Sequence, residues 1–277
     1  MAPISDDAFK FLQLFLERES GIVIGENKRY LLEIRLMSLL REEGLEDFNA
    51  LVSAMRGTQA PRYGLRIVES MTTHETLWFR DAFPFDHFRD AMLKPAADRP
   101  GAGLRVWCAA CATGQEPYSL SMLVEEMALQ RPGHAPSVKI MATDISEAAL
   151  RIAREGRYDA LTLRRGMDDQ RLQRFFDRRE DDWKIRSEIA SRISFRPANL
   201  LTSFSLFGQF DAIFCRNVLI YFSSDKKLDI LDRLIQALRP GGTLFLGASE
   251  AIPESLVNEY RLVRQACGGG IYLKPSD

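Results

Sequence analysis

The segment Val106–Leu120 reads VWCAACATGQEPYSL and joins three kinds of local sequence. Its apolar start predicts the end of a strand, its small residues predict a turn, and the part after the turn predicts the start of a helix. Thr113 followed by Glu116 has the spacing of a capping box, which would begin that helix. A strand, a small-residue turn and a helix predict the ligand-binding edge of an α/β fold, because small side chains let a ligand approach the backbone.

The composition of the 277-residue chain is that of a globular protein, with 46% hydrophobic and 27% charged residues. A formal net charge of −1 disfavours nucleic acid as a partner. The N-terminal stretch MAPISDDAFK has acidic residues before its first apolar run, unlike a signal peptide, and no apolar run reaches membrane-spanning length. We therefore expect a cytoplasmic protein with no direct membrane insertion.

The four cysteines are too few for a disulfide scaffold in a chain of this length. Cys108 and Cys111 form a C-x-x-C motif like that of thioredoxin-like redox proteins, but small cysteines in such a turn more often serve packing. A zinc site would need a second close pair of ligands, whereas Cys215 and Cys267 lie far apart in the sequence. We expect neither a redox centre nor a metal site.

The first part of the chain has helical periodicity. Apolar residues recur at helical spacing through residues 4–21, with Gly21 as a stop signal. Asn27 predicts the N-cap of a second amphipathic helix, and Gly44 predicts its end. Two shorter helical segments follow, around Phe48–Met55 and Arg62–Met71. These segments predict a small helical bundle.

After Pro100 the pattern changes to alternating strands and helices. Five short apolar runs predict a parallel sheet covered on both faces, namely LRVWCAA, VKIMATD, RISFRPAN, FDAIFCRN and TLFLGAS. The interval from Arg151 to Ala198 has more Lys and Arg than Asp and Glu and is too long for one crossover helix. Within it, DRREDDWKIRSEI followed by SRISFRP predicts an antiparallel hairpin or small sheet, although a solvated charged loop would have the same composition.

Polar residues follow the predicted strands. Asp144 ends the second predicted strand, Asn199 follows the third and the pair Arg216–Asn217 follows the fourth, and the carboxyl ends of parallel strands meet at one edge. Any one of them could be a helix cap, but together with the small-residue turn they predict a nucleoside site. The turn lacks G-x-G-x-x-G, and the chain has no P-loop motif, so a nucleoside without phosphates fits best. S-adenosylmethionine is the common cofactor of this kind.

Five motifs in order closely resemble the CheR family of chemoreceptor glutamate methyltransferases: MTTHETLWFRD, VWCAACATGQEPYSL, ATDIS, PANLL and FDAIFCRNVLIYF. The resemblance covers essentially the whole chain. It implies an α/β protein with an N-terminal helical domain (1–72) and a Rossmann-like class I methyltransferase domain (73–277), which carries an inserted antiparallel β-subdomain at about 155–197. It also implies S-adenosylmethionine as cofactor, S-adenosylhomocysteine as product, and the cytoplasmic domain of chemoreceptors as partner.

The resemblance further implies individual site residues. It implies catalytic roles for Arg80 and for Tyr221, which matches a tyrosine placed near the transferred methyl group. Family members commonly have Asn where this chain has His74. The implied cofactor-binding residues are His74, Thr76, Arg80, Glu116, Asp144, Asn199, Leu200, Arg216 and Asn217.

The chemistry implied by the resemblance needs no general base, because a glutamate side chain with a pKa of about 4.3 is already ionised at neutral pH. Two alternatives remain on sequence grounds. One is a methyltransferase for another substrate, such as a small-molecule acid. The other is a non-catalytic adaptor that binds receptors or senses S-adenosylhomocysteine, and the intact Arg80 and Tyr221 argue against it.

Two charged segments carry expectations about receptor recognition. Lys28, Arg29, Arg35 and Arg41 lie on or beside the second predicted helix, and we expect this helix to face glutamate-rich receptor helices; a merely solvated face is the alternative. Some family members bind a receptor tail peptide through a longer, glycine-containing loop of the β-subdomain. The corresponding stretch DRREDDWKIR is short, acidic in its middle and free of glycine, so we expect the receptor-tail tether to be absent.

Overall fold

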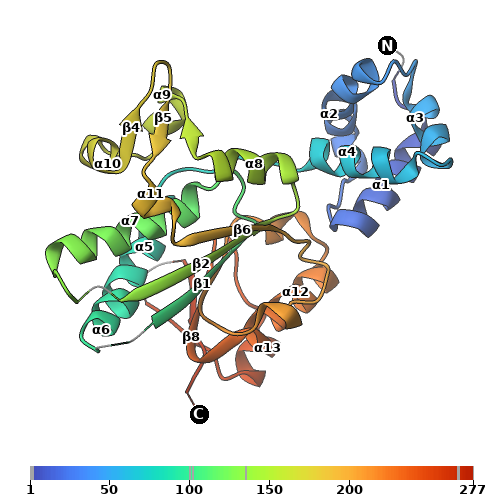
Figure 1. Cartoon of the computed structure of the whole chain (residues 1–277). Coiled ribbons are helices and arrows are strands. Elements are labelled where there is room, and N and C mark those ends of the chain that lie inside the picture. The colour runs from blue at the N-terminus through green and yellow to red at the C-terminus, as the bar shows by residue number, and fades with distance from the viewer. Residues whose placement is uncertain (1–2, 100, 102, 135, 267–268, 277) are drawn as a thin grey trace. The chain divides into compact units, whose positions relative to one another are not determined.

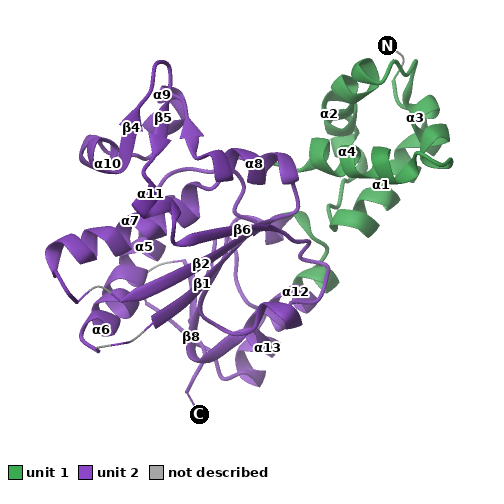
Figure 2. Ribbon diagram, in the orientation of Figure 1, with its two compact units in different colours: residues 1–73, 221–227 green, residues 74–220, 228–277 purple. Residues whose placement is uncertain are grey.

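The computed structural model describes residues 3–99, 101, 103–134, 136–266 and 269–276 (Figure 1). The chain divides into two compact units (Figure 2). The helical unit comprises Met1–Thr73 together with Tyr221–Lys227, and the sheet unit comprises His74–Ile220 together with Leu228–Asp277. Within the described ranges, none of the helices combines the length and the apolar character needed to cross a bilayer.

The helical unit confirms the predicted helical start of the chain. Ser5 caps the first helix by accepting a hydrogen bond from the backbone of Ala8, and Gly21 ends it in a left-handed conformation with φ of 76°. The prediction for Asn27 was wrong, because this residue lies in a 3₁₀ turn, and the next helix begins at Arg29 without a side-chain cap. The elements of the unit are α1 (Asp6–Ser20), η1 (Glu26–Lys28), α2 (Arg29–Glu42), α3 (Phe48–Met55) and α4 (Ala60–Met71).

The core of the helical unit is apolar and forms where α1, α2 and α3 pack against α4. Leu12, Leu36 and Ile67 are fully buried there. Arg35, one of the cations expected on the receptor-facing helix, also has a structural contact. Its guanidinium donates to the carbonyl of Met71 at 2.6 Å and to the hydroxyl of Thr73 at 2.8 Å. A cation at this position satisfies the unpaired carbonyl groups at the end of α4.

The sheet unit contains a seven-stranded mixed sheet in the order β6-β2-β1-β7-β8-β10-β9. The first five strands of this order pair in parallel, and β10 pairs antiparallel with both β8 and β9. The late strands β10 and β9 therefore give the sheet an antiparallel edge. The strands are β1 (Gly103–Ala109), β2 (Ser137–Asp144), β6 (Ile193–Pro197), β7 (Phe210–Cys215), β8 (Leu238–Leu246), β9 (Val263–Arg264) and β10 (Gly270–Leu273).

Helices cover both faces of this sheet, as predicted for a parallel arrangement. On one face, alternate strand residues such as Val106, Ala142 and Phe214 form a core with side chains from α5, η2, α6, α7 and α8. Figure 1 shows α12 and α13 on the opposite side from α5, α6 and α7. The helices are α5 (Phe83–His87), the π-helical turn η2 (Phe88–Leu93), α6 (Lys94–Ala97), α7 (Gln115–Gln130), α8 (Glu147–Glu155), α12 (Ser224–Gln236) and α13 (Glu254–Glu259).

The insertion forms a separate three-stranded antiparallel sheet in the order β3-β5-β4. The stretch DRREDDWKIRSEI supplies its β4–β5 hairpin, as predicted. SRISFRP does not join it, because Ile193–Pro197 pairs in parallel with β2 of the main sheet. The elements of the insertion are β3 (Arg157–Tyr158), α9 (Ala160–Arg164), α10 (Asp169–Phe175), β4 (Phe176–Arg178), β5 (Trp183–Ile185) and α11 (Ser187–Ala190); two further short turns are η3 (Ser205–Phe207) and η4 (Leu219–Tyr221).

The insertion packs around Trp78, which comes from the linker before the main sheet. Trp78 is 1% exposed and lies among Tyr158, Phe176 and other buried side chains of the insertion. Its backbone N–H donates to the carbonyl of Arg165 at 3.1 Å. A Cβ atom on Gly166 would lie 2.1 Å from the Trp78 carbonyl oxygen, so only glycine fits there. The linker and the insertion are therefore one packed structure.

Candidate functional site

The parallel strands β6, β2, β1 and β7 are neighbours, so their carboxyl ends lie at one edge of the sheet. β2 ends at Asp144, β7 ends one residue before Arg216, and Asn199 follows β6 by two residues. The predicted polar residues after these strands therefore share one edge, together with the small-residue turn after β1. This edge is the candidate site.

The turn after β1 has a strained backbone. Ala110 and Ala112 have positive φ values of 60° and 49°, and Gly114 has a φ of 95°. Such conformations are costly for alanine and are found mainly where the surrounding structure enforces them. The turn is held on one side by Cys111, whose N–H donates to the carbonyl of Thr143 at 2.9 Å. The turn thus brings only small side chains to the site edge, and Cys111 and Ala112 are themselves buried.

The predicted capping box was wrong. Gly114, in the left-handed conformation, is the N-cap of α7 and provides no side-chain cap. The hydroxyl of Thr113 donates to the side-chain oxygen of Gln115 at 2.8 Å. Glu116 does not return to the helix terminus, because it pairs with Arg216. A sequence spacing cannot distinguish these two uses of the same glutamate.

Asp144 lies buried at the end of β2 and holds two backbone segments. One carboxylate oxygen accepts from the N–H of Ala112 at 2.8 Å, and the other accepts from the N–H of Ser146 at 2.9 Å. His74 lies nearby, with its Nε2 atom 3.9 Å from the second oxygen. That nitrogen is buried and has no hydrogen-bond partner within the described residues. Each carboxylate oxygen keeps a lone pair for a further donor.

Arg216 lies at the centre of a buried ionic cluster. Its guanidinium donates to Glu116 at 2.9 Å, to Asp81 at 2.7 Å and to the backbone carbonyl of Arg80 at 2.8 Å. The Arg216 side chain is only 2% exposed. Burial raises the pKa of Glu116 above its usual value, and the neighbouring Arg216 opposes that rise. Glu116 and Arg216, both predicted as cofactor-binding residues, are therefore also partners of one another.

The linker residues beside this cluster have unusual backbone conformations. Phe79, Asp81 and Ala82 have positive φ values of 48°, 68° and 48°. The N–H of Ala82 donates to the carbonyl of Phe79 at 3.1 Å, which closes a tight turn around Arg80. No hydrogen bond or ion pair within the described residues involves the Arg80 guanidinium. Asp81 was missed on sequence grounds, because nothing in the motif indicated that it would face Arg216.

A second missed residue is Glu250, which follows β8. Its buried carboxylate accepts hydrogen bonds from the backbone N–H groups of Asn217, Leu219 and Gly247, at 2.8, 2.9 and 2.8 Å. Asn217 has a positive φ of 58°. Glu250 thus holds the loop after β7 in the conformation that presents Asn217 at the site edge. An acidic residue soon after a buried strand, in GASE, was the available signal.

The remaining predicted residues differ in how they are used. The side-chain oxygen of Asn199 accepts from the N–H of Leu201 at 3.0 Å, so Asn199 also stabilises its own turn. Leu200 is 7% exposed, and Thr76 is partly buried. Tyr221 groups with the helical unit, and its carbonyl accepts from the N–H of Val23 at 3.0 Å. Its role near the methyl group stays a prediction.

The cysteines of the C-x-x-C motif are buried and free. Burial raises the pKa of both the Cys108 and the Cys111 thiol well above the usual value. A redox-active cysteine needs the opposite shift and access to its partner, so the packing interpretation is favoured. Cys215 is likewise buried, whereas Cys267 lies outside the described residues.

Comparison with known proteins assigns both parts of the chain. Residues 7–72 match the family described as CheR methyltransferase, all-alpha domain, and residues 74–267 match CheR methyltransferase, SAM binding domain. Chemotaxis protein methyltransferase 1 of Pseudomonas aeruginosa is 45% identical over 95% of this chain and 96% of its own length. Chemotaxis protein methyltransferase Cher2 of Pseudomonas putida is 44% identical over the same shares. The chemotaxis protein methyltransferase of Escherichia coli is 36% identical over 89% of this chain and 85% of its own length. This chain belongs to the CheR family of S-adenosylmethionine-dependent chemotaxis methyltransferases.

Proposed function

We propose that this methyltransferase transfers a methyl group to glutamate side chains in the cytoplasmic domain of chemoreceptors, forming glutamate methyl esters. The observation that carries the proposal is the contrast between two arginines of the site edge. Both terminal nitrogens of Arg216 are bound, by Glu116, Asp81 and a backbone carbonyl, and its Nε has no hydrogen-bond partner within the described residues. The neighbouring Arg80 has no side-chain partner in the described part of the chain. Its planar guanidinium is therefore available to bind a carboxylate of the cofactor or of the substrate.

The residues at the strand ends fit the cofactor. The buried Nε2 of His74 has no hydrogen-bond partner among the described residues, and the Asp144 carboxylate beside it keeps acceptor capacity for ribose hydroxyls. The alanines of the β1 turn place no bulky side chain at the site edge. S-adenosylmethionine supplies the methyl group on a positively charged sulfonium. The other proposed binding residues are Thr76, Arg80, Glu116, Asn199, Leu200, Arg216 and Asn217.

The proposed reaction requires alignment of the substrate carboxylate with the methyl group and requires no proton transfer. The substrate carboxylate is ionised at neutral pH, so the protein has no proton to remove before methyl transfer. Methyl transfer from a cation to an anion neutralises both charges, and a site that excludes water assists this step. Arg80 would orient a carboxylate. Tyr221 would place its ring or hydroxyl beside the methyl group.

The domain limits and the location are proposed in the same terms. The matched ranges 7–72 and 74–267 support a helical domain over 1–72 and a methyltransferase domain over 73–277. The three-stranded sheet, which runs from Arg157 to Ile185, supports an inserted β-subdomain within the proposed range of about 155–197. Receptor methylation would take place in the cytoplasm.

The exposed cations of α2 are proposed to steer the acidic receptor helices. Lys28 and Arg41 are exposed beside and on this helix. Arg35 keeps its charge, but the Met71 carbonyl and the Thr73 hydroxyl hold its guanidinium at the end of α4, so it is less free to approach a receptor. Arg29 is paired with Asp6 at 2.7 Å, so its charge is partly neutralised. The steering charge would therefore come mainly from Lys28 and Arg41.

A receptor-tail tether is proposed to be absent. The hairpin turn between β4 and β5 is short, and the N–H of Arg179 donates to the carbonyl of Asp182 at 2.8 Å across it. The Asp182 side chain is paired with Arg157, so Glu180 and Asp181 would supply most of the repulsion toward an acidic peptide. A closed, short turn offers little surface beside the strand edge for a peptide that binds by strand addition.

The decisive experiment uses the whole chain with S-adenosylmethionine labelled in the methyl group and receptor-rich membranes. The expected result is label in the receptor that is released as methanol by mild base, because methyl esters are base-labile. Cofactor binding without base-labile label would favour a non-catalytic adaptor. Base-stable label, or label in a small-molecule acid, would contradict the glutamate assignment.

A further inference from the structure

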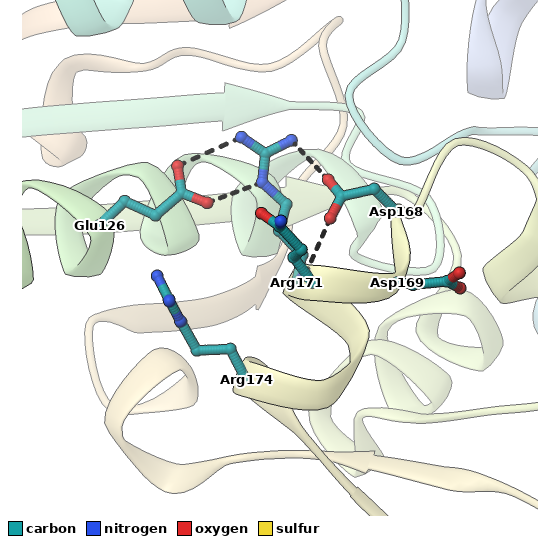
Figure 3. Close-up of a pocket in the computed structure, with 6 residues that line it drawn as sticks. Glu126, Asp168, Asp169, Arg171 and Arg174 are labelled. Atoms are coloured by element: carbon teal, nitrogen blue, oxygen red, sulfur yellow. Dashed lines mark hydrogen bonds and ion pairs between the residues drawn. The ribbon is translucent and has the colours of Figure 1, made fainter.

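A pocket of about 330 Å³ lies beside α10 of the insertion, and one of its lining residues links three segments of the sheet unit. Figure 3 shows Arg171 between the carboxylates of Glu126 and Asp168, with Arg174 outside this ionic network. Arg171 donates to Glu126 through Nε at 2.7 Å and through Nη2 at 3.2 Å. It also donates to Asp168 at 3.2 Å. The bidentate pair with Glu126 fixes the plane of the guanidinium against α7.

The same guanidinium contacts the linker that leads to the candidate site. Its central carbon lies 3.9 Å from the centre of the Phe79 ring, a close cation–π contact. Phe79 has a positive φ of 48°, and its N–H donates to the Ser119 hydroxyl of α7 at 3.2 Å. A bulky residue holds such a conformation only when its surroundings enforce it. The Arg171 guanidinium and Ser119 are two of these surroundings.

Phe79 directly precedes the residues that form the site edge. The next residue is Arg80, whose carbonyl is bound by Arg216, and Asp81 follows with its carboxylate on the same guanidinium. A change in the Phe79 backbone would therefore move both Arg80 and Asp81. Arg171 belongs to the insertion, but its contact with Phe79 connects it to the site edge through this single residue.

We propose that Arg171 is a positioning residue, which holds the Phe79–Asp81 turn in the conformation that binds cofactor by clamping the Phe79 ring between the insertion and α7. This inference rests on the proposed function, because it assigns Arg80 and its neighbours to the cofactor site. Arg171 touches neither cofactor nor substrate. Without its planar guanidinium, the strained turn populates other conformations, and apparent cofactor affinity falls in proportion to the lost competent fraction.

The test compares two arginine-to-lysine changes by calorimetry with S-adenosylhomocysteine. Arg171→Lys keeps the charge but loses the bidentate fork and the flat face over Phe79. We expect it to weaken binding by about three- to tenfold. Arg157→Lys is the matched control, because Arg157 also forms a two-bonded pair, with Asp182, within the insertion but away from the linker. We expect its affinity to stay within about twofold of the unmodified protein.

A double-mutant cycle separates positioning from general stability. If Arg171 acts through the Phe79 ring, Phe79→Leu and Arg171→Lys should each weaken binding, and the double variant should be little weaker than either one. Additive effects, or an unchanged affinity for Arg171→Lys, would overturn the proposal. Phe79→Leu alone also tests it should Arg171→Lys fold poorly, since unchanged binding would contradict a role for the ring. Failure of the unmodified protein to bind S-adenosylhomocysteine would instead refute the proposed cofactor site, and this inference with it.

Discussion

Arg216 in the sheet unit and Arg66 in the helical unit each pair with two carboxylates. In the sheet unit, Arg216 pairs with Glu116 and Asp81, and its side chain is 2% exposed. In the helical unit, Arg66 pairs with Glu42 and Glu43, and its side chain is 31% exposed. The two arginines have the same pattern of ion pairs, but they differ in their exposure to solvent.

The difference in burial gives the two clusters different consequences. A charge removed from water must be matched by close partners, so loss of Arg216 would leave buried negative charge uncompensated. Arg66 remains partly solvated, and its partner Glu43 also receives a hydrogen bond from Arg62 at 2.7 Å. The site edge is thus built from groups that depend on one another. In the helical unit, Arg66 is a charge that can be replaced with little loss.

The largest expected effect comes from breaking the buried cluster. Arg216→Met should destabilise the sheet unit by about 3–5 kcal/mol, whereas Arg66→Met should cost the helical unit about 1 kcal/mol or less. Urea unfolding followed by tryptophan fluorescence measures the first, because Trp78, Trp107 and Trp183 all lie in the sheet unit. Far-ultraviolet circular dichroism follows the second. Similar losses for both variants would contradict the distinction by burial.

A smaller effect is expected at the strand end of β2. Asp144→Ala removes a charged acceptor and should weaken S-adenosylhomocysteine binding by about 1.5–3 kcal/mol, as measured by calorimetry. The matched control is Asp211→Ala in β7, because Asp211 also accepts from a backbone N–H, that of Arg105 at 2.7 Å, but is not at a strand's carboxyl end. Unchanged affinity in Asp144→Ala, or an equal loss in the control, would refute the ribose assignment.

Tyr221 tests whether a residue grouped with the helical unit takes part in methyl transfer. Tyr221→Phe removes only the hydroxyl, so turnover should fall by up to about tenfold while cofactor affinity changes little. Initial rates with receptor membranes and calorimetry with S-adenosylhomocysteine measure the two quantities. Equal effects on both, or none on turnover, would leave the hydroxyl without a catalytic role.

The exposed cations of the helical unit should have a modest and salt-dependent effect. Lys28→Glu combined with Arg41→Glu should slow receptor methylation severalfold at low ionic strength, with little change in cofactor affinity or stability. Arg35→Glu is the informative contrast, because it should lower the melting temperature of the helical unit by removing the α4 cap. Normal rates for the double variant at low salt would count against steering by this helix.

The smallest effect is expected from shortening the receptor. Removing the last few residues of a receptor should leave the initial methylation rate unchanged if no tether is used. A flexible tether would raise the local concentration to roughly millimolar, so its loss would be evident at low receptor concentration. A large drop on truncation, with measurable binding of the free tail peptide, would contradict the proposal.

Much of the fold could be predicted from local sequence. Helical periodicity predicted the helices at the start of the chain, and short apolar runs predicted the parallel strands, because such patterns record which faces of an element are buried. Local patterns failed where two structures share one pattern. Ile193–Pro197 could pair with the insertion or with the main sheet, and only the neighbouring β2 strand selected the latter.

The sequence by itself determined which polar residues stand at the ends of the strands, because strand order and chain direction place Asp144, Asn199 and Arg216 at one edge. Tertiary structure alone decided their partners. Glu116 pairs with Arg216 and does not cap its own helix, and Arg35 binds the carbonyl at the end of α4. Asp81 and Glu250 also take part in the site edge. Residues up to 135 positions apart form these contacts. Burial makes an unpaired charge or backbone group costly, so each such group takes the partner that the fold brings close, and a local pattern contains no information about that partner.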